Sequence, residues 1–321
     1  MILVTGAAGF IGSQVATLLL EQGHEVVGVD NLDVTYDVRL KEWRLARLRE
    51  QPGFTFQRVD ITERGAVDAL FEQGAPEGLV NLAAHAGVQA SIDDPWAYYA
   101  TNLTGTLNLL EACRAHGVGK FVLSSTSSAY GARGGAFRED DHTDRPLSPY
   151  AASKKAAETL CYTYHHLHGL DVSVLRYFTV YGPAGRPDMS IFRFIRQIAE
   201  GETLRVTGDG TQSRDFTFVE DVARGTVASL RPLGYEVINL GCDQPESING
   251  VIATLEGLLE KPAQVTYVPS RPADVPTTSA DITKARRLLE WEPRTRLAQG
   301  LARAVEWYRV NRDWLVEAPL P

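Results

Sequence analysis

Short apolar runs alternate with helical stretches along the first half of the chain. Between the first two runs, Ile11, Val15 and Leu18 recur at the spacing of one helix face, and Gly23 stands where that helix would end. A strand, a helix and a second strand in this order pair in parallel, because the helix carries the chain back across the sheet. The pattern predicts an α/β fold with a doubly wound parallel sheet. Its first five strands are predicted at residues 2–5, 25–30, 54–60, 79–83 and 121–124.

Two helices in this half begin with recognisable caps. One is predicted to start at Asp94, with Pro95 as its first residue, and to run to about His116. Another is predicted to start at Ser148, with Pro149 in the corresponding place. Proline suits this position because its missing N–H would have no partner in the first turn of a helix. We therefore expect one long helix after the fourth strand and another after the fifth.

After Arg176 the alternation becomes irregular, and glycine and proline clusters separate the helical stretches. Helices are predicted at residues 191–200, 219–230, 248–259 and 300–312, and we expect them to form a smaller mixed C-terminal lobe. The sequence therefore predicts two domains, residues 1–176 and residues 177–321. Some segments of the second domain are expected to return to the first.

Composition narrows the function classes. The 321 residues are 44% hydrophobic and 22% charged, enough for a substantial core. A net charge of -8 without a long basic run argues against nucleic acid or an anionic membrane as the main partner. The three cysteines, Cys113, Cys161 and Cys242, form no CxxC pair or Cys/His cluster, so we expect neither a metal site nor a disulfide framework. Without an apparent leader or membrane span, we expect a cytoplasmic protein.

A glycine-rich turn follows the first strand and opens the first helix. It comprises Gly6, Gly9 and Gly12, with Phe10 and Ile11 between the last two. Backbone N–H groups at such a turn can bind a pyrophosphate, and the helix N-terminus adds partial positive charge. The spacing is GxxGxxG and not GxGxxG, and glycines here could also serve tight packing alone. Its place between strand and helix favours dinucleotide binding.

A carboxylate stands where a dinucleotide's ribose would need one. Asp30 ends the second strand about 20 residues after the turn, where it would accept hydrogen bonds from the adenosine ribose. It would repel a 2′-phosphate, and Asn31 and Leu32 supply no arginine to offset this, so NAD is favoured over NADP. Asp60 and Ile61 could contact the adenine, although Asp60 could also be an ordinary strand-end residue. We predict a Rossmann-type NAD-binding domain.

Tyr150 and Lys154 are candidates for proton transfer. Their i, i+4 spacing puts both on one face of the helix that begins at Pro149. A run of five hydroxyl residues, 124–128, follows the fifth strand, at the sheet edge where α/β proteins bind ligands. Within it, Thr126 is predicted to bind a substrate oxygen. Ser127 and Ser128 are predicted substrate contacts that could alternatively cap a turn.

Electrostatics suggests how Tyr150 could act as a base. A free tyrosine has a pKa of about 10, too high for a base at neutral pH. One unit charge at about 4 Å, with an effective dielectric constant near 20, is worth roughly 4 kcal/mol, or about three pKa units. We therefore expect Lys154 and an oxidised nicotinamide to bring the pKa of Tyr150 towards neutrality. Tyr150 would then take a proton from a substrate hydroxyl while hydride leaves the carbon beneath it.

With these motifs in order, the chain resembles the extended short-chain dehydrogenase/reductases, specifically the nucleotide-sugar epimerases, over nearly its whole length. The resemblance implies that residues 176–183 pass beneath the nicotinamide and the sugar. It places Arg214 and Arg271 on the substrate pyrophosphate and Asp274 on the nucleotide ribose, although either arginine alone could be a surface ion pair. On the same resemblance we assign Leu82, Ala83, Ala84 and Tyr177 to the cofactor and Thr179 to the substrate.

Several short stretches are similar to the UDP-glucuronate 4-epimerases within this family: residues 30–32, 36–41, 44–48 and 185–189. Arg186 would suit a sugar carboxylate, which a guanidinium group binds with two parallel hydrogen bonds, but it could also be a solvated charge. Relatives often carry arginine at the position of Gln89 and tryptophan at that of Ala184, so the specificity at the sugar end stays open. His85 lies near the expected nicotinamide and is left unassigned.

The resemblance implies an isomerase that binds NAD and epimerises a UDP-sugar at C4 through a 4-keto intermediate, with UDP-glucuronate to UDP-galacturonate favoured. UDP-glucose or UDP-N-acetylglucosamine 4-epimerisation, UDP-glucuronate decarboxylation and a non-enzymatic NAD-binding role are the alternatives. A 4,6-dehydratase is disfavoured, because relatives of that type carry an Asp-Glu pair where Ser127 and Ser128 stand. The resemblance also implies a homodimer formed by the helices over residues 94–116 and 148–168.

Overall fold

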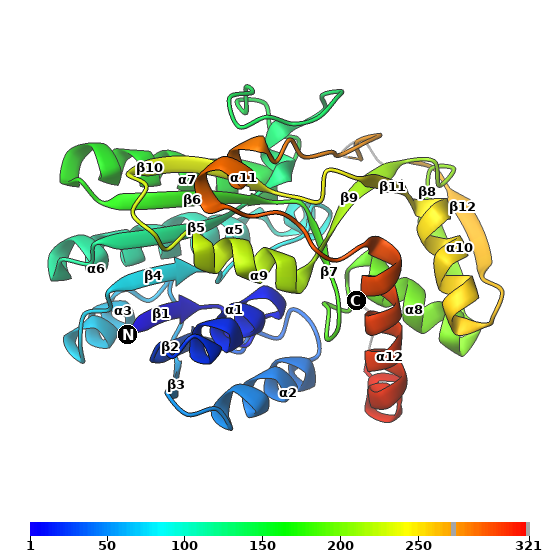
Figure 1. The fold of residues 1–321 in the computed structure, drawn as a ribbon, viewed down its shortest axis with the longest axis horizontal. Coiled ribbons are helices and arrows are strands. Elements are labelled where there is room, and N and C mark those ends of the chain that lie inside the picture. Colours follow the sequence, from blue (N-terminus) through cyan, green and yellow to red (C-terminus); the bar gives the residue numbers. More distant parts are fainter. Residues whose placement is uncertain (271–273, 319–321) are drawn as a thin grey trace.

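A parallel sheet of seven strands forms the centre of the computed structural model, which describes residues 1–270 and 274–318 (Figure 1). The strand order is β10-β6-β5-β4-β1-β2-β3, so the direction of winding reverses between β1 and β4. This arrangement confirms the predicted doubly wound fold. The strands are β1 (Ile2–Thr5), β2 (Val26–Asp30), β3 (Phe54–Arg58), β4 (Gly78–Asn81), β5 (Lys120–Thr126), β6 (Asp171–Tyr177) and β10 (Tyr235–Leu240).

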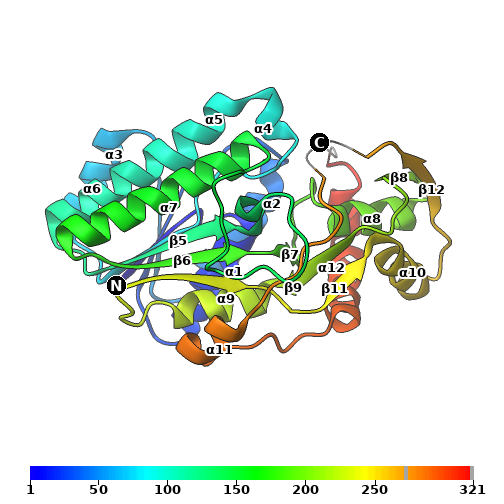
Figure 2. The ribbon, with the colours of Figure 1, turned by 90° about the horizontal axis from the view of Figure 1, so that it is seen from above.

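Helices cover both faces of this sheet, as the view from above shows (Figure 2). One face carries α1 (Phe10–Glu21), α9 (Val219–Ala228) and α11 (Thr283–Leu289), whose apolar side chains share one core with the strands. The other carries α3 (Arg64–Glu72), α6 (Thr106–His116) and α7 (Pro149–His168) over a second core. The central strands β1, β4, β5 and β6 are buried on both faces, which explains their nearly continuous apolar runs, whereas the edge strand β3 is only partly buried.

A smaller lobe lies beyond the carboxyl ends of the strands (Figure 1). It has its own apolar core, in which buried side chains from three helices and the short strands meet. The helices of the lobe are α8 (Ser190–Glu200), α10 (Ile248–Leu259) and α12 (Leu297–Leu315). Its strands are β7 (Thr179–Tyr181), β8 (Thr203–Thr207), β9 (Ser213–Phe218), β11 (Pro245–Ser247) and β12 (Gln264–Val268), which form a mixed sheet of three and a parallel pair.

Two segments of the second half return to the large sheet. The helix predicted at residues 219–230 is observed as α9, but its placement in the C-terminal lobe was wrong. Val222 and Ala223 are buried in the core beneath the large sheet, and α9 packs against α1. The next strand, β10, then pairs with β6 at the edge of that sheet. The chain therefore crosses between the two units more than once.

The helix predicted from Asp94 to His116 is not a uniform α-helix. Asp94 caps it through the N–H of Ala97 at 3.4 Å, as expected, and α5 (Pro95–Tyr99) begins it. A π-helical segment, η1 (Ala100–Gly105), then interrupts it before α6. The apolar spacing does not reveal such a widened turn, so the prediction was wrong in the middle of the helix. In α7 the predicted cap holds, with Ser148 accepting the N–H of Ala151 at 3.2 Å.

Candidate active site

A cavity of about 460 Å³ lies at the carboxyl ends of the strands, where the strand order reverses, and extends to the smaller lobe. All but one of the residues predicted for cofactor, substrate and proton transfer line it. They are Gly6, Gly9, Phe10, Ile11, Gly12, Asp30, Asn31, Asp60, Ile61, Leu82, Ala83, Ala84, Thr126, Ser127, Ser128, Tyr150, Lys154, Tyr177, Thr179, Arg186, Arg214 and Asp274. The exception, Arg271, lies outside the described residues. The structure thus brings the set together, and the individual roles remain predictions.

The glycine-rich turn is both tightly packed and open to the cavity. Gly6 has a left-handed φ of 67°, and a Cβ there would lie 2.7 Å from the backbone nitrogen of Ala83. A Cβ on Gly12 would lie 2.0 Å from the carbonyl oxygen of Gly6. The N-terminus of α1 begins after Gly9, which supplies no side-chain cap. Packing therefore requires glycine here, and the same turn presents a bare helix N-terminus to the cavity.

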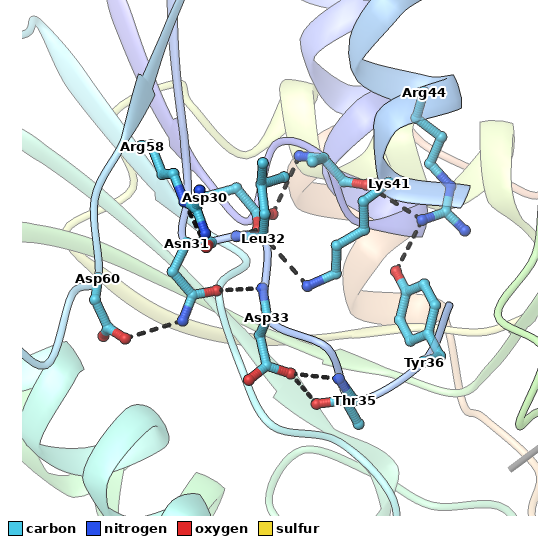
Figure 3. A network of polar contacts seen from close by, with 11 residues as sticks. Asp30, Asn31, Leu32, Asp33, Thr35, Tyr36, Lys41, Arg44, Arg58 and Asp60 are labelled. Atoms are coloured by element: carbon cyan, nitrogen blue, oxygen red, sulfur yellow. Dashed lines mark hydrogen bonds and ion pairs between the residues drawn. The ribbon is translucent and has the colours of Figure 1, made fainter. Parts of the chain in front are cut away.

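Asp30 is a buried carboxylate with acceptor capacity to spare. It accepts the N–H groups of Ala8 at 3.2 Å and Leu32 at 2.8 Å, and the ammonium of Lys41 lies 3.7 Å away (Figure 3). A carboxylate has about four acceptor positions, so two are left for ribose hydroxyls. Sequence reasoning missed Lys41 as a site residue, because α2 (Val38–Arg49) brings it back to Asp30 only in the folded chain.

A second polar cluster fixes Asn31 at the cavity wall. The amide of Asn31 donates to Asp60 at 2.9 Å and its oxygen accepts the N–H of Asp33 at 2.9 Å (Figure 3). Burial raises the pKa of Asp60, but the hydrogen bonds from Asn31 and Thr62 outweigh it, so the pKa lies below its ordinary value. Asp60 therefore stays ionised and does more than end a strand. Asp33 was not predicted as part of the site.

Tyr150 and Lys154 face the cavity from the first two turns of α7. Tyr150 hydrogen-bonds with Thr126 at the end of β5, and the ammonium of Lys154 donates to Ser124 at 3.3 Å. Thr126 also accepts the N–H of Ser128 at 3.1 Å. The predicted base, its cation and the hydroxyl run therefore form one connected group on two neighbouring elements.

The expected lowering of the Tyr150 pKa is not found in the protein alone. Burial raises the pKa of Tyr150, and the hydrogen bond with Thr126 and the charge of Arg186 offset this only in part. Burial also lowers the pKa of Lys154 to about 8, against the opposing charge of Glu158. Both groups lose hydration that favours their charged forms. In the protein alone, Lys154 therefore does not bring the pKa of Tyr150 towards neutrality.

The residues of the hydroxyl run differ in their hydrogen bonds. Thr126 caps η2 (Ser127–Tyr130), the short 3₁₀ helix that follows β5, so the two serines are not needed as caps. Both serines line the cavity, and among the described residues neither serine hydroxyl has a hydrogen-bond partner. Ser127 and Ser128 are thus available to a ligand.

Arg186 is held in place and is not a solvated charge. Its side chain is 18% exposed and binds the two oxygens of Asp188 at 3.0 and 2.6 Å and the carbonyl of Ala86 at 2.9 Å. Burial lowers the pKa of Arg186, but Asp188 outweighs it, so the pKa is raised and the group stays charged. Asp188 occupies the two-oxygen position that we expected for a sugar carboxylate. Within the described residues, only Nη1 is left without a hydrogen bond.

The lobe contributes a further cation to the cavity, Arg214. Arg214, on β9, donates to the carbonyl of Ser213 at 2.8 Å. Burial lowers its pKa, and the charge of Asp274 opposes this, so these two predicted nucleotide contacts act on each other. Two other predicted contacts from the second half also line the cavity: Tyr177, whose hydroxyl binds Thr226 at 2.8 Å, and Thr179.

The two departures from the relatives lie in different settings. Ala184 is buried, has a left-handed φ of 53° and does not line the cavity. Gln89 does not line the cavity, and its buried Nε2 finds no hydrogen-bond partner among residues 1–270 and 274–318. His85 does line the cavity, with its ring 5.6 Å from that of Tyr98. Neither departure therefore contributes to the cavity wall directly.

Comparison with known proteins identifies the family. The NAD dependent epimerase/dehydratase family matches residues 2–241. This chain belongs to that family. This membership confirms the resemblance to the nucleotide-sugar epimerases. The matched residues include the Rossmann half and the segment that carries Arg186 and Arg214.

Individual family members match almost end to end. A UDP-glucuronate 4-epimerase from Thermodesulfobacterium geofontis is 56% identical over 310 residues, which cover 96% of each chain. The crystal structure of UDP-glucuronic acid 4-epimerase from Bacillus cereus, in complex with UDP-glucuronic acid and NAD, has a TM-score of 0.92 and 40% identity, covering 97% of this chain and 99% of that one. UDP-glucose 4-epimerase from Thermotoga maritima, with UDP-glucose, has a TM-score of 0.88 and 34% identity at 97% and 99% coverage.

The residues present fit the cofactor of this family. The turn at Gly6–Gly12 offers backbone N–H groups without a side chain in the way, and Asp30 retains acceptor positions for a ribose.

Within the described residues there is no group of three or more His, Cys, Asp or Glu side chains that could hold a metal ion. No helix in the described part of the chain is long and apolar enough to cross a membrane.

Proposed function

We propose that the protein is an NAD-dependent UDP-glucuronate 4-epimerase, an isomerase that interconverts UDP-glucuronate and UDP-galacturonate. One observation carries this proposal: a single cavity joins the glycine-rich turn, the Tyr150–Lys154 pair and Arg186. The relative at 56% identity, which bears this name, supports the choice of substrate. In the division we propose, residues 1–176 mainly hold NAD and residues 177–321 mainly hold the UDP-sugar.

Each side chain has a proposed task in the reaction. When bound, NAD supplies a reversible hydride acceptor for C4 of the sugar, so that the sugar passes through a 4-keto state. Tyr150 takes the proton of the C4 hydroxyl and later returns it to the turned sugar, and Thr126 hydrogen-bonds the same oxygen. Lys154, donating to Ser124, provides positive charge beside the phenol. Ser127, Ser128 and Thr179 bind the sugar, and Arg214, Arg271 and Asp274 bind its nucleotide.

UDP-glucose 4-epimerisation is the second candidate, favoured by a specific observation. Arg186 already has a two-oxygen carboxylate partner in Asp188. The carboxylate of Asp188 partly neutralises the positive charge of Arg186, which the carboxylate of a uronate would need. For UDP-glucuronate to be the better substrate, its carboxylate must bind the remaining Nη1 of Arg186 or replace Asp188.

A product assay tests the proposal. Purified protein should convert UDP-glucuronate to UDP-galacturonate without added reductant, as followed by chromatography or NMR. A UDP-pentose product would instead indicate decarboxylation. The proposal fails if no UDP-sugar in a panel of uronates and neutral hexoses is epimerised. Tyr150→Phe, which keeps the ring and removes the acid–base group, should reduce the rate by about 10²–10⁴-fold.

We also propose that the protein is a homodimer. The outer face of α5, α6 and α7 exposes large apolar side chains: Trp96 at 83%, Leu107 at 37%, Tyr162 at 53% and Leu167 at 65%. Apolar side chains gathered on adjacent helices are typical of an interface, and a two-fold axis would pair this face with itself.

The three free thiols agree with a reducing compartment, so we place the dimer in the cytoplasm.

A further inference from the structure

Arg44 is a buried cation that the proposed reaction does not use. It lies in the middle of α2, is only 2% exposed and lines neither the sugar end nor the base. Its guanidinium makes five hydrogen bonds, four of them to backbone carbonyls and one to a phenol. A buried charge needs such partners to offset its lost hydration. These partners come from three separate segments of the chain.

The first of these segments is the glycine-rich turn. Nη1 of Arg44 donates to the carbonyl of Ala8 at 3.2 Å. The N–H of the same residue donates to Asp30 at 3.2 Å, so both polar groups of Ala8 are fixed. Arg44 and Asp30 thereby hold the turn from two sides, close to where the pyrophosphate and ribose of a dinucleotide would lie. Figure 3 shows Arg44 and Asp30 within one polar network.

The second segment is the loop that leads into Arg186. Arg44 donates to the carbonyl of Ala184 through Nε at 3.1 Å and Nη2 at 2.7 Å, and to that of Gly185 at 3.3 Å. Ala184 has a left-handed φ of 53°, which a residue with a Cβ adopts only when its surroundings hold it there. The hydrogen bonds from Arg44 supply such a restraint, and Arg186 follows two residues after Ala184.

The third segment contributes Tyr36, whose ring also lies close to Arg186. Its hydroxyl accepts from Nη1 of Arg44 at 2.8 Å (Figure 3). The ring centroid of Tyr36 lies 5.6 Å from the guanidinium carbon of Arg44 and 5.9 Å from that of Arg186. Tyr36 is 8% exposed and lines the cavity. The ring therefore provides a second route, through packing, from Arg44 to Arg186.

From these contacts we infer that Arg44 is a positioning residue that fastens the glycine-rich turn to the loop before Arg186. Dinucleotide bound at the turn then also orders Arg186 in the substrate half of the cavity. Only a planar guanidinium with five donors can reach Ala8, Tyr36, Ala184 and Gly185 together, because lysine has three donors on one atom. The part that concerns uronate binding rests on the proposed function, whereas the coupling between turn and loop does not.

Hydrogen–deuterium exchange tests the coupling without a sugar. In the wild type, adding NAD to cofactor-free protein should slow exchange both in residues 6–12 and in residues 182–189. In Arg44→Lys, protection of residues 6–12 should persist, and that of residues 182–189 should fall to the cofactor-free level. Arg47→Lys is the matched control, an exposed arginine on the same helix that packs on Trp43, and should behave as the wild type. Unchanged protection of residues 182–189 in Arg44→Lys overturns the inference.

A milder variant covers the case in which Arg44→Lys does not fold. Tyr36→Phe keeps the ring and removes one of the five hydrogen bonds. It should lose part of the NAD-dependent protection of residues 182–189, and full protection in this variant would count against the inference. NAD content of the purified protein, measured after denaturation, gives a second readout, and it should be lower in Arg44→Lys than in Arg47→Lys.

Binding measurements extend the test to the substrate. Calorimetry on the NAD-loaded protein should show UDP-glucuronate binding weakened about tenfold by Arg44→Lys, with UDP-glucose nearly unaffected. In an Arg186→Ala background, Arg44→Lys should cause no further loss, because the two residues act in series. Equal losses in both backgrounds would refute the coupling. A wild type that epimerises no uronate would end the proposed function but leave the exchange result to decide the inference.

Discussion

At the scale of single residues, the site places two ionisable groups where neither prefers to be charged. Burial raises the pKa of Tyr150 and lowers that of Lys154 to about 8. In the protein alone, Tyr150 is therefore a neutral phenol at pH 7. Base chemistry needs the positive charge that an oxidised nicotinamide brings to the same cavity. The phenol is thus expected to become a base only in the loaded enzyme.

The buried ammonium of Lys154 predicts a specific dependence of stability on pH. The pKa of Lys154 in the folded protein is about 8, below the ordinary value of 10.5. Between these two pH values the unfolded chain therefore binds more protons than the folded protein. As a result, the contribution of Lys154 to the free energy of unfolding rises with pH in this range. Lys154→Met removes this contribution. In cofactor-free protein, the urea midpoint of Lys154→Met relative to that of the wild type should be higher at pH 7 than at pH 9.5. The explanation is wrong if the difference between the two proteins does not change with pH.

At the scale of elements, α7 is anchored by a buried ion pair one turn beyond Lys154. Glu158, only 1% exposed, binds the guanidinium of Arg176 at 3.0 and 2.8 Å and accepts from Ser125 at 2.6 Å. These contacts join α7 to β6 and β5. Burial raises the pKa of Glu158, but the pairing with Arg176 outweighs it, so the pKa is lowered. The helix that carries Tyr150 and Lys154 is therefore fixed on β6 and on β5, the strand that carries the hydroxyl run.

Glu158→Gln should destabilise the protein by about 3–5 kcal/mol, because it leaves the charge of Arg176 buried without its partner. Urea unfolding followed by circular dichroism measures this. The control is Glu220→Gln, which breaks an ion pair with Arg303 whose side chains are 45% and 50% exposed. That change should cost less than about 1 kcal/mol. Similar costs for both variants would show that α7 does not depend on the buried pair.

The π-helical segment η1 has a comparable role on the other side of α7. Asn102 lies within η1 and is 1% exposed. Its amide donates to the carbonyl of His85 at 2.9 Å and to the hydroxyl of Ser153 at 3.0 Å, and its oxygen accepts the N–H of His85 at 3.0 Å. The segment thus connects the loop after β4 to α7. The apolar spacing did not predict this interruption, because the contacts of Asn102 are made with distant segments of the chain.

At the scale of the whole molecule, the cavity depends on both units of the chain. Tyr150 comes from a helix that covers the large sheet, whereas Arg186 and Arg214 come from segments that lead into the lobe. The charge of Arg186 nevertheless reaches Tyr150 and offsets part of the rise in its pKa that burial causes. Arg186 and Tyr150 are therefore electrostatically linked across the two units.

Arg186→Ala should discriminate between uronate and neutral substrates. Losing a charge-assisted hydrogen bond of about 1.5–3 kcal/mol should raise KM for UDP-glucuronate by roughly 10–100-fold, while KM for UDP-glucose changes little. Steady-state kinetics with both sugars measures the split. Arg138→Ala, at a side chain that is 65% exposed, is the control. Equal increases for both sugars would mean that Arg186 does not recognise the carboxylate.

The proposed dimer makes a separate prediction. Trp96→Glu places a charge on the exposed apolar face of α5 and should shift the protein from dimer to monomer, because a buried unpaired carboxylate is costly at an interface. Sedimentation velocity distinguishes the two states. Val310→Glu, on α12 of the lobe and 74% exposed, should leave the assembly unchanged. A wild type that sediments as a monomer at all concentrations would rule out the dimer.

The sequence alone determined what depends on neighbouring residues. Apolar spacing, caps and glycines placed the first strands, α1 and the start of α7, and the i, i+4 spacing put Tyr150 and Lys154 on one face, because local backbone geometry fixes these relations. Only the tertiary structure decided how distant segments meet: the return of α9 to the large sheet, Lys41 beside Asp30, and Asp188 against Arg186. It also decided the pKa of Tyr150. Burial and long-range contacts arise from packing, which a local pattern does not specify.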